Sequence, residues 1–455
     1  KEIKKVCGKD FPVSLRYSVE SKTKGFREGA LPGEEYVEAG RDMAESEKAV
    51  KYLQDAGYDM LNCDNGTYDA WYWAHPPIYM PENCNLEDVE HIRKFVDIPV
   101  VCAGRMDPRV AADAIRDGRL DGAGFARQFL ADQEWVTKLM NGQEDNIRPC
   151  ILCHNGCFNM CHYKGVPNDQ ALSDSLHLAR CAVNAETMQW DKHKLIKTAS
   201  PKKVHIIGGG IGGMEAARVL KLRGHEPVIH EKKGELGGTF IAASAESYKG
   251  KLRDLLTWYK KQMKDLHIEI HYNEEIRSLE MFAGSPVIIA TGSVARVLKK
   301  VPGHEKMVEA CEYLTGTPVG EKVAVVGGGL TGCEIAYELA LQGKKPVIVE
   351  MKDDLIAQTG VCLANSSYLR EWFAWQKVPV YLETTLQSVE DGRIICKDKE
   401  GREITIPCDS VISSAGYLPN PLAEESRNVH LVGDCKQVGN LRSVVWRAYE
   451  AAMKI

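Results

Sequence analysis

The sequence predicts an α/β protein in which parallel strands alternate with helices, and three observations support this prediction. Four short apolar strands alternate with helical stretches in residues 1–149. A cysteine-rich stretch follows between Cys150 and Cys181. From residue 200 onwards, two glycine-rich loops each stand between an apolar strand and a helix. Such alternation is typical of βα units with a parallel sheet, and 455 residues allow two or three domains, each with its own core.

Composition and charge exclude several classes of function. The formal net charge is -5 with both signs mixed along the chain, so there is no basic surface for nucleic acid or a membrane. We find no apolar run long enough to span a bilayer and no signal-peptide pattern at the first residues, and therefore expect a soluble, cytoplasmic protein. Fifteen cysteines in such a chain indicate a reducing compartment, where most of them are ordinary buried thiols.

The first 149 residues contain four βα units. The expected strands are Val13–Tyr17, Tyr58–Asn62, Pro99–Ala103 and Gly122–Ala126. The expected helices are Met43–Ala56, Leu86–Phe95, Pro108–Asp117 and Leu130–Asn141. A closed (β/α)8 TIM barrel needs eight units and about 250 residues. We therefore expect only the C-terminal half of such a barrel here, with further chain before Lys1, because half a barrel would leave two open sheet edges.

Three arginines stand where the expected barrel strands end. Arg16 closes the first strand, Arg105 follows Gly104 after the third, and Arg127 follows Ala126 after the fourth. Barrel enzymes place their chemistry at this face. The amides of a glycine turn, together with guanidinium groups, bind phosphate well. One such arginine alone would be interpreted as half of a surface ion pair, but three at successive strand ends favour a phosphate site.

An aromatic loop, Cys63–Pro77, follows the second expected strand. Aromatic side chains this dense at a catalytic face can stack on a flat ring, and Tyr68 or His75 can supply a proton. Equally, aromatic residues on the rim of a barrel can pack against a neighbouring domain. The residues alone leave both interpretations open.

Thiolate ligands for a metal centre explain the cysteine-rich stretch better than disulfides do. Cys150, Cys153 and Cys157 form a close triplet, and Cys181 lies farther along the chain. An iron–sulfur cluster needs soft thiolate donors from a tight loop and one more from farther away. A structural zinc ion and buried free thiols remain the alternatives. Cys161 is a spare fifth thiol.

The first glycine-rich loop follows the expected strand Lys202–Ile207. Gly208, Gly210 and Gly213 give a GxGxxG pattern that opens a helix, and Glu231 ends the next strand. In this context the pattern binds a dinucleotide, with the pyrophosphate at the helix N-terminus and a ribose hydroxyl on the acid. The structural alternative is that the glycines serve only tight helix–strand packing. It explains less, because the acid recurs in a second copy.

The second glycine-rich loop repeats the pattern with Gly327, Gly329 and Gly332, and Glu350 ends its next strand. Two such units predict one flavin fold interrupted by a nicotinamide fold. An acid at Glu350 hydrogen-bonds a ribose 2′-hydroxyl and repels a 2′-phosphate, so NADH is favoured over NADPH, although Lys352 lies close.

The segment Val429–Asp434 resembles the strand that returns to the first fold in flavoproteins with two dinucleotide-binding domains. An acid at this place contacts the ribityl chain or pyrophosphate of FAD in such proteins. The remaining residues expected to contact FAD are Gly238, Thr291, Gly292, Gly433 and Asp434.

Together these motifs resemble one flavoenzyme family. The matching segments are Ser14–Arg16, Tyr68–Pro77, Cys102–Met106, Ala126–Asp132 and the cysteine triplet. They look like the 2-enoate reductase and 2,4-dienoyl-CoA reductase branch of the Old Yellow Enzyme family. The resemblance implies an FMN-bearing barrel, a [4Fe-4S] cluster and an FAD/NAD(P)H module on one chain.

The resemblance also assigns roles to individual residues. It places Arg16, Arg105, Ala126 and Arg127 at FMN-contacting positions, and Cys150, Cys153, Cys157 and Cys181 at the cluster-ligand positions. Tyr68 stands where the dienoyl-CoA reductases have a proton-handling histidine, and the aromatic loop is closer to the 2-enoate and bile-acid-type reductases. The proton-donor tyrosine of the family belongs to the barrel half that this sequence does not contain.

The expected domain division follows these motifs. It assigns 1–149 to the barrel half, 150–199 to the cluster segment and linker, 200–295 with 405–455 to FAD, and 296–404 to NAD(H). The implied activity is NADH-dependent reduction of the activated C=C bond of a 2-enoate or a related unsaturated acid, acyl-CoA, steroid or bile-acid derivative. Electrons would pass from NADH through FAD and the cluster to FMN and the substrate.

The expected partners are NADH and this small unsaturated molecule, and a homo-oligomer is compatible with the sequence. Other functions stay open at this point. They are a diaphorase that feeds a separate protein, the reverse desaturation, and a non-catalytic redox sensor or assembly scaffold.

Overall fold

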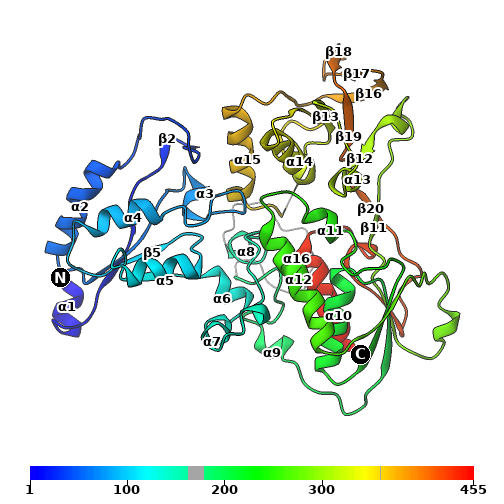
Figure 1. Cartoon of the computed structure of the whole chain (residues 1–455), viewed down its shortest axis with the longest axis horizontal. Coiled ribbons are helices and arrows are strands. Elements are labelled where there is room, and N and C mark those ends of the chain that lie inside the picture. The colour runs from blue at the N-terminus through cyan, green and yellow to red at the C-terminus, as the bar shows by residue number, and fades with distance from the viewer. Residues whose placement is uncertain (162–178, 359) are drawn as a thin grey trace. The chain divides into compact units, whose positions relative to one another are not determined.

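The computed structural model describes residues 1–161, 179–358 and 360–455, and the chain divides into two compact units (Figure 1). The first unit contains Lys1–Arg127 and Leu363–Ala374, and the second contains Gln128–Cys362 and Trp375–Ile455. In the described residues, no helix combines the length and the apolarity needed to cross a bilayer.

A four-stranded parallel sheet forms the centre of the first unit. Its strands lie in sequence order: β1 (Ser14–Ser18), β4 (Met60–Asp64), β5 (Val100–Ala103) and β6 (Gly122–Gly124). Helices between the strands bury one apolar face each, and they are α2 (Met43–Asp55), α4 (Leu86–Arg93) and α5 (Pro108–Arg116). Sequential parallel strands joined by helices are the arrangement of a TIM-type barrel, which confirms the predicted fold class for this segment.

The fourth predicted helix, Leu130–Asn141, is wrong in one respect, because the structure has two short helices there. They are α6 (Arg127–Ala131) and α7 (Trp135–Met140). Asp132 stands at the break, and its carboxylate accepts hydrogen bonds from the backbone amides of Glu134 (3.1 Å) and Arg148 (2.9 Å). A side chain that bonds local amides in this way competes with helix continuation.

The first unit has further elements that the periodicity did not predict. They are α1 (Glu2–Cys7), the antiparallel pair β2 (Thr23–Gly25) and β3 (Glu28–Gly29), α3 (Trp71–Ala74) and α15 (Leu363–Trp375). Helix α15 is distant in sequence, yet the Tyr368 ring meets the Tyr72 ring edge-on, with centroids 5.5 Å apart, and stacks on Tyr79 at 5.4 Å. A segment from the C-terminal half therefore belongs to the barrel unit.

The second unit contains two five-stranded sheets, and the first begins at the first glycine-rich loop. All its strands are parallel, in the order β21 (Val429–Leu431), β10 (Val287–Ile289), β7 (Lys203–Ile207), β8 (Glu226–Glu231) and β9 (Glu269–Tyr272). Helix α10 (Ile211–Leu222) packs against α12 (Gly250–Asp265) and α16 (Leu441–Lys454) (Figure 1). Met214 and Trp446 are fully buried in this core.

The second five-stranded sheet has the same design. Its parallel order is β12 (Val308–Glu309), β19 (Ser410–Ser413), β13 (Lys322–Val326), β14 (Lys345–Val349) and β15 (Val380–Tyr381), and α14 (Leu330–Leu341) follows β13. An antiparallel sheet of β16 (Thr385–Glu390), β17 (Arg393–Lys397) and β18 (Glu403–Pro407) is attached, as is the pair β11 (Ser293–Ala295) and β20 (Tyr417–Pro419). Short helices complete the unit: α8 (Phe158–Cys161), α9 (Trp190–His193), α11 (Phe240–Ala243), α13 (Ala310–Leu314), η1 (Glu144–Asn146), η2 (Glu280–Phe282), η3 (His304–Lys306) and η4 (Gly433–Cys435).

The nested order of the two dinucleotide folds is visible in the strand pairing. Strand β21 returns to the first sheet beside β10, whereas β19 pairs with β13 in the second sheet. Residues 405–416 therefore belong to the nicotinamide fold. The motifs alone had placed them in the flavin fold, as the start of its second part, 405–455. With that change, we propose the same four-part division of the chain.

Candidate functional site

The first glycine-rich loop has the geometry that a dinucleotide requires. Gly208 has φ +108°, and a methyl group on it would lie 2.5 Å from the carbonyl oxygen of Ala290. A methyl group on Gly213 would lie 1.9 Å from the Gly208 carbonyl oxygen, so helix α10 can approach strand β7 only with glycine there. Gly210 is the N-cap residue of α10, and a methyl group on it would meet only the backbone of Gly237 and Gly238, at 4.0 Å. A pyrophosphate can therefore reach the helix N-terminus.

The acid of this loop lies where the motif requires it. The Glu231 carboxylate is buried and accepts hydrogen bonds from the backbone amides of Gly209 (2.7 Å) and Lys233 (2.8 Å). Gly238 lies against the loop, since a methyl group on it would be 3.2 Å from the Cα atom of Gly210. These residues fit the adenosine half of FAD.

The second glycine-rich loop repeats this geometry closely. Gly327 has φ +111°, and a methyl group on Gly332 would lie 1.9 Å from the Gly327 carbonyl oxygen. The buried Glu350 accepts hydrogen bonds from the amides of Gly328 (2.6 Å) and Lys352 (2.8 Å). The backbone amide of Lys352 thus holds the acid in place. These contacts fit the ribose of a nicotinamide dinucleotide.

The returning segment places Asp434 beside the first fold. Its carboxylate accepts hydrogen bonds from the amide of Gly439 (3.1 Å) and the hydroxyl of Ser293 (3.4 Å), and burial raises its pKa. Gly433 has φ +66° and Gly292 has φ +73°. The Thr291 hydroxyl donates to the carbonyl oxygen of Asn420 at 2.5 Å. Asp434 is therefore a partly satisfied acceptor at the edge of the flavin fold.

Of the four candidate cluster cysteines, Cys181 belongs to the core of the second unit, and Cys150 and Cys153 pack against that core. The Cys150 amide donates to the Gln128 side chain (2.9 Å), and the Trp446 indole donates to the Cys181 carbonyl (2.9 Å). Gly156 brings the triplet loop against the distal cysteine, because a methyl group on it would lie 2.5 Å from the Cys181 backbone. The sequence-distant ligand is thus fixed beside the loop.

The electrostatics of these thiols fit a metal centre. Burial raises the pKa of Cys181 to about 12, and it also raises the pKa of Cys153, with further contributions from neighbouring Cys157 and Cys150. Buried thiolates so close together need a cation to balance their charge. A donor set of four sulfur atoms suits an iron–sulfur cluster.

A structural zinc ion with four thiolate ligands remains the alternative. The Cys161 side chain and residues 162–178 lie outside the described part of the chain.

Two of the three barrel arginines lie close together. Arg105 donates to the Ile78 carbonyl and Arg127 to the Pro76 carbonyl, each at 2.8 Å. Burial lowers the pKa of Arg105, and the nearby positive charge of Arg127 lowers it further. The Arg105 Nε atom is buried without a hydrogen-bond partner. Two such guanidinium groups favour an anion between them, as the FMN phosphate would be.

Glycine is required beside this arginine pair. Gly104 has φ +129°, and a methyl group on it would lie 2.1 Å from the Asn85 side-chain nitrogen. Arg105 itself has φ +48°, so the chain turns sharply after β5. Ala126 directly precedes Arg127 after the neighbouring strand β6.

The contacts of Arg16 differ from those of this arginine pair. Its guanidinium donates to the Asn62 side chain (2.7 Å) and forms an ion pair with Asp64 on strand β4. Burial raises the pKa of Asp64 to about 6, and Arg16 opposes this shift. Half of the Arg16 side chain is exposed, so a ligand can still reach it.

The aromatic loop divides into buried and exposed residues. Trp71, Tyr72 and Trp73 are buried. Tyr68 is 72% exposed, and its ring lies 4.8 Å from that of Trp71, which in turn stacks on His75 at 5.9 Å. The two candidate proton donors therefore both lie beside the Trp71 indole.

Sequence reasoning missed Glu371 on α15. The Tyr72 hydroxyl donates to its carboxylate at 2.6 Å, and burial raises its pKa to about 7. The two residues are 299 positions apart, so no local spacing could have paired them. The one available signal was the aromatic content of Leu363–Trp375, which is unusual for a surface helix.

Comparisons with known proteins agree with this geometry. The NADH:flavin oxidoreductase / NADH oxidase family matches residues 1–146, and the pyridine nucleotide-disulphide oxidoreductase family matches residues 202–435. A cinnamate reductase from Clostridium sporogenes is 40% identical over 100% of this chain and 68% of its own length. An NADH oxidase from Thermoanaerobacter brockii is 29% identical, with the same coverage of both chains.

A solved structure shares the fold. The complex of 2-naphthoyl-CoA reductase with 2-naphthoyl-CoA superposes with a TM-score of 0.83 at 24% identity, over 100% of this chain and 66% of that one. The chain thus spans about two thirds of the length of its relatives. It belongs to the NADH:flavin oxidoreductase / NADH oxidase family, in the 2-enoate reductase branch of the Old Yellow Enzymes, and is a flavoprotein oxidoreductase that uses FMN, FAD and NAD(P)H.

Proposed function

We propose that this protein is an NADH-dependent ene-reductase that reduces the activated C=C bond of a 2-enoate. The observation that supports this most strongly is the 40% identity with a cinnamate reductase along the whole chain. An aryl-substituted 2-enoate is accordingly the first substrate class to test. We also propose that it works in a reducing compartment such as the cytoplasm, since the buried Cys63, Cys102, Cys181 and Cys435 are free cysteines.

The residues of the chain have separate tasks in this proposal. When bound, FAD, FMN and a [4Fe-4S] cluster supply hydride and single-electron transfer. Glu231 and the amides at Gly210 hold the FAD side, and Glu350 with the amides at Gly329 binds the NADH side. The arginine pair holds the FMN phosphate, with Arg16 as a further FMN contact.

Proton supply is the second task of the barrel unit. Tyr68 is our candidate for the catalytic proton carrier because its side chain is exposed at the end of β4, and His75 is the second candidate. The Tyr72–Glu371 hydrogen bond fixes the buried part of the same loop. With a pKa of about 7, Glu371 holds a proton through part of the physiological range.

The experiment that tests the proposal separates the two halves of the reaction. We expect the purified protein to oxidise NADH anaerobically in the presence of cinnamate or a related 2-enoate, and to contain iron and both flavins. Cys153→Ser should abolish enoate reduction but leave NADH reduction of FAD intact with an artificial acceptor. Cys7→Ser is the matched control, since Cys7 is exposed and remote in sequence from the cluster segment. Loss of both activities in Cys153→Ser alone would contradict the proposed separation.

A diaphorase is the second candidate, and the NADH oxidase relative is the observation that favours it. A diaphorase would reduce artificial acceptors at full rate without any enoate reduction and would contain FAD but no FMN. Flavin analysis of the purified protein therefore distinguishes the two functions.

A further inference from the structure

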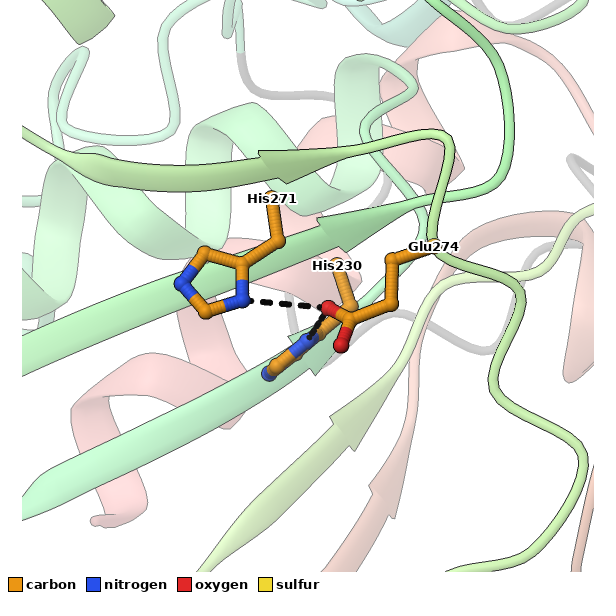
Figure 2. A group of neighbouring side chains, drawn as sticks. All are labelled: His230, His271 and Glu274. Carbon is orange, nitrogen blue, oxygen red and sulfur yellow. Dashed lines mark hydrogen bonds and ion pairs between the residues drawn. The ribbon is translucent and has the colours of Figure 1, made fainter.

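A group of metal-ligating side chains lies at the edge of the flavin sheet, outside the sites described above. His230 on β8 and His271 on β9 are paired in register, and Glu274 follows directly after β9. Figure 2 shows the two imidazole rings and the carboxylate converging on one another. Among the described residues, this is the group of three or more such side chains whose ligand atoms all lie within 4.8 Å of one another.

The donor atoms of the three side chains face one another, and a bound ion would replace the hydrogen bonds between them. One carboxylate oxygen of Glu274 lies 2.5 Å from His230 Nδ1 and 3.1 Å from His271 Nδ1. His230 is buried, and its ring contacts that of Phe282 at 5.0 Å. The His271 and Glu274 side chains are about two-fifths exposed, so an ion can enter from solvent.

The other ring nitrogen of each histidine already has a partner. His271 Nε2 lies 2.8 Å from a carboxylate oxygen of Glu269, and His230 Nε2 lies 3.0 Å from His205 Nδ1. Histidines that ligate a metal commonly donate their second N–H to a carboxylate or another acceptor, which fixes the tautomer and the ring orientation. Here the same arrangement directs both Nδ1 atoms toward Glu274.

A neutral hydrogen-bond network does not satisfy all these contacts. A neutral His271 carries one ring hydrogen but faces a carboxylate with both nitrogens, Glu269 on one side and Glu274 on the other. One nitrogen lone pair then points at a carboxylate oxygen. Either a second proton on the ring or a metal ion at Nδ1 removes this conflict.

We propose that His230 Nδ1, His271 Nδ1 and the Glu274 carboxylate bind one divalent transition-metal ion of the zinc class. Two imidazole nitrogens and one carboxylate are donors that zinc accepts and that magnesium and calcium disfavour. Three protein ligands leave a fourth position for water.

The position of the site gives the bound metal a structural effect. The Glu274 amide donates to the Glu231 carbonyl at 2.9 Å, and the Asn273 amide donates to the Lys233 carbonyl at 3.1 Å. The proposed ligand is thus tied to the strand end that carries the acid of the FAD loop. Because β9 is the edge strand of its sheet, a metal between β8 and β9 stabilises an otherwise open edge.

Calorimetric titration of the flavin- and iron-loaded protein with ZnCl2 tests the proposal, with MgCl2 as the comparison ion. We expect one zinc equivalent per chain and a rise in the unfolding temperature, with neither for magnesium. Loaded iron keeps the cysteines occupied, so that they do not compete for zinc. Iron content is measured before and after the titration.

Matched variants show which side chains bind the zinc ion. Glu274→Gln and His271→Ala should weaken zinc binding at least about tenfold, and Glu269→Gln, which removes only the outer partner, by about tenfold. Glu275→Gln is the control, because Glu275 is the neighbouring exposed carboxylate and pairs with Arg277. Zinc binding equal in Glu274→Gln and Glu275→Gln, or absent from the unmodified protein, would overturn the proposal. The exposed Glu269 and His271 provide variants that test the site even where Glu274→Gln fails to fold.

Discussion

The two glycine-rich loops of the second unit have nearly identical backbones but different surroundings. In both, the last glycine would place a methyl group 1.9 Å from the first glycine's carbonyl oxygen, and a buried glutamate accepts two backbone amides. A methyl group on Gly210 would meet only the backbone of Gly237 and Gly238, at 4.0 Å. Above Gly329 the Gln358 side chain occupies the corresponding space, and its carbonyl oxygen accepts a hydrogen bond from the Leu330 amide at 3.1 Å.

This difference matches the two kinds of ligand that the loops are proposed to bind. FAD stays bound, so its helix N-terminus needs no substitute ligand. NADH enters and leaves, and a neutral oxygen on the free helix N-terminus satisfies an amide that would otherwise lack a partner. The comparison teaches that the GxGxxG pattern fixes the backbone, whereas the side chains around it distinguish a resident cofactor from an exchanging one.

The largest expected effect comes from adding a methyl group to the last glycine of each loop in turn. Gly213→Ala and Gly332→Ala both insert a methyl group at a contact of 1.9 Å, which costs about 3 kcal/mol or more, or at least about 100-fold in binding. We expect Gly213→Ala to lose FAD during purification. Gly332→Ala should retain FAD, while its rate of flavin reduction by NADH falls. Flavin content and anaerobic stopped-flow absorbance measure the two outcomes.

The reverse result would break the comparison. If Gly332→Ala lost FAD and Gly213→Ala kept it, the two loops would have exchanged roles. Circular dichroism of both variants serves as the control for folding.

A smaller effect is expected from the acid of the second loop. Glu350→Gln removes the negative charge that opposes a 2′-phosphate, so kcat/KM for NADPH relative to NADH should rise about tenfold. The kcat/KM for NADH itself should fall, because one amide at Gly328 or Lys352 no longer has a carboxylate acceptor. Glu231→Gln, the matched change in the first loop, should leave the nicotinamide preference unchanged. An unchanged preference in Glu350→Gln would assign discrimination to other residues.

The same contrast explains how much could be predicted from the sequence. Both loops, their acids and the parallel sheets were predictable, because each depends on neighbours within one βα unit. The cysteine ligands stay a prediction, with which the close approach of Gly156 to the Cys181 backbone is consistent. The break in the helix predicted at 130–141 was missed because Asp132 is held by Arg148, which lies outside that segment.

Residues that act through long-range contacts were not predictable. The Tyr72–Glu371 pair joins an aromatic loop to a helix from the other end of the chain, and no periodicity encodes such a contact. The His230–His271–Glu274 group was missed for a related reason. Its histidines meet only because β8 and β9 pair in one register, and Glu274 is brought in by the turn that follows β9.

The smallest effect is expected from Gln358, and it tests the comparison most directly. Its exposed side chain contributes one hydrogen bond to the Leu330 amide in the free protein, and NADH must displace it. A net hydrogen bond is worth about 0.5–1.5 kcal/mol, so Gln358→Ala should lower KM for NADH by about two- to tenfold and leave FAD content unchanged. Steady-state kinetics with an artificial acceptor measures this change. A rise in KM would mean that Gln358 binds the nucleotide, and the contrast between an open and a substituted helix N-terminus would then have no functional meaning.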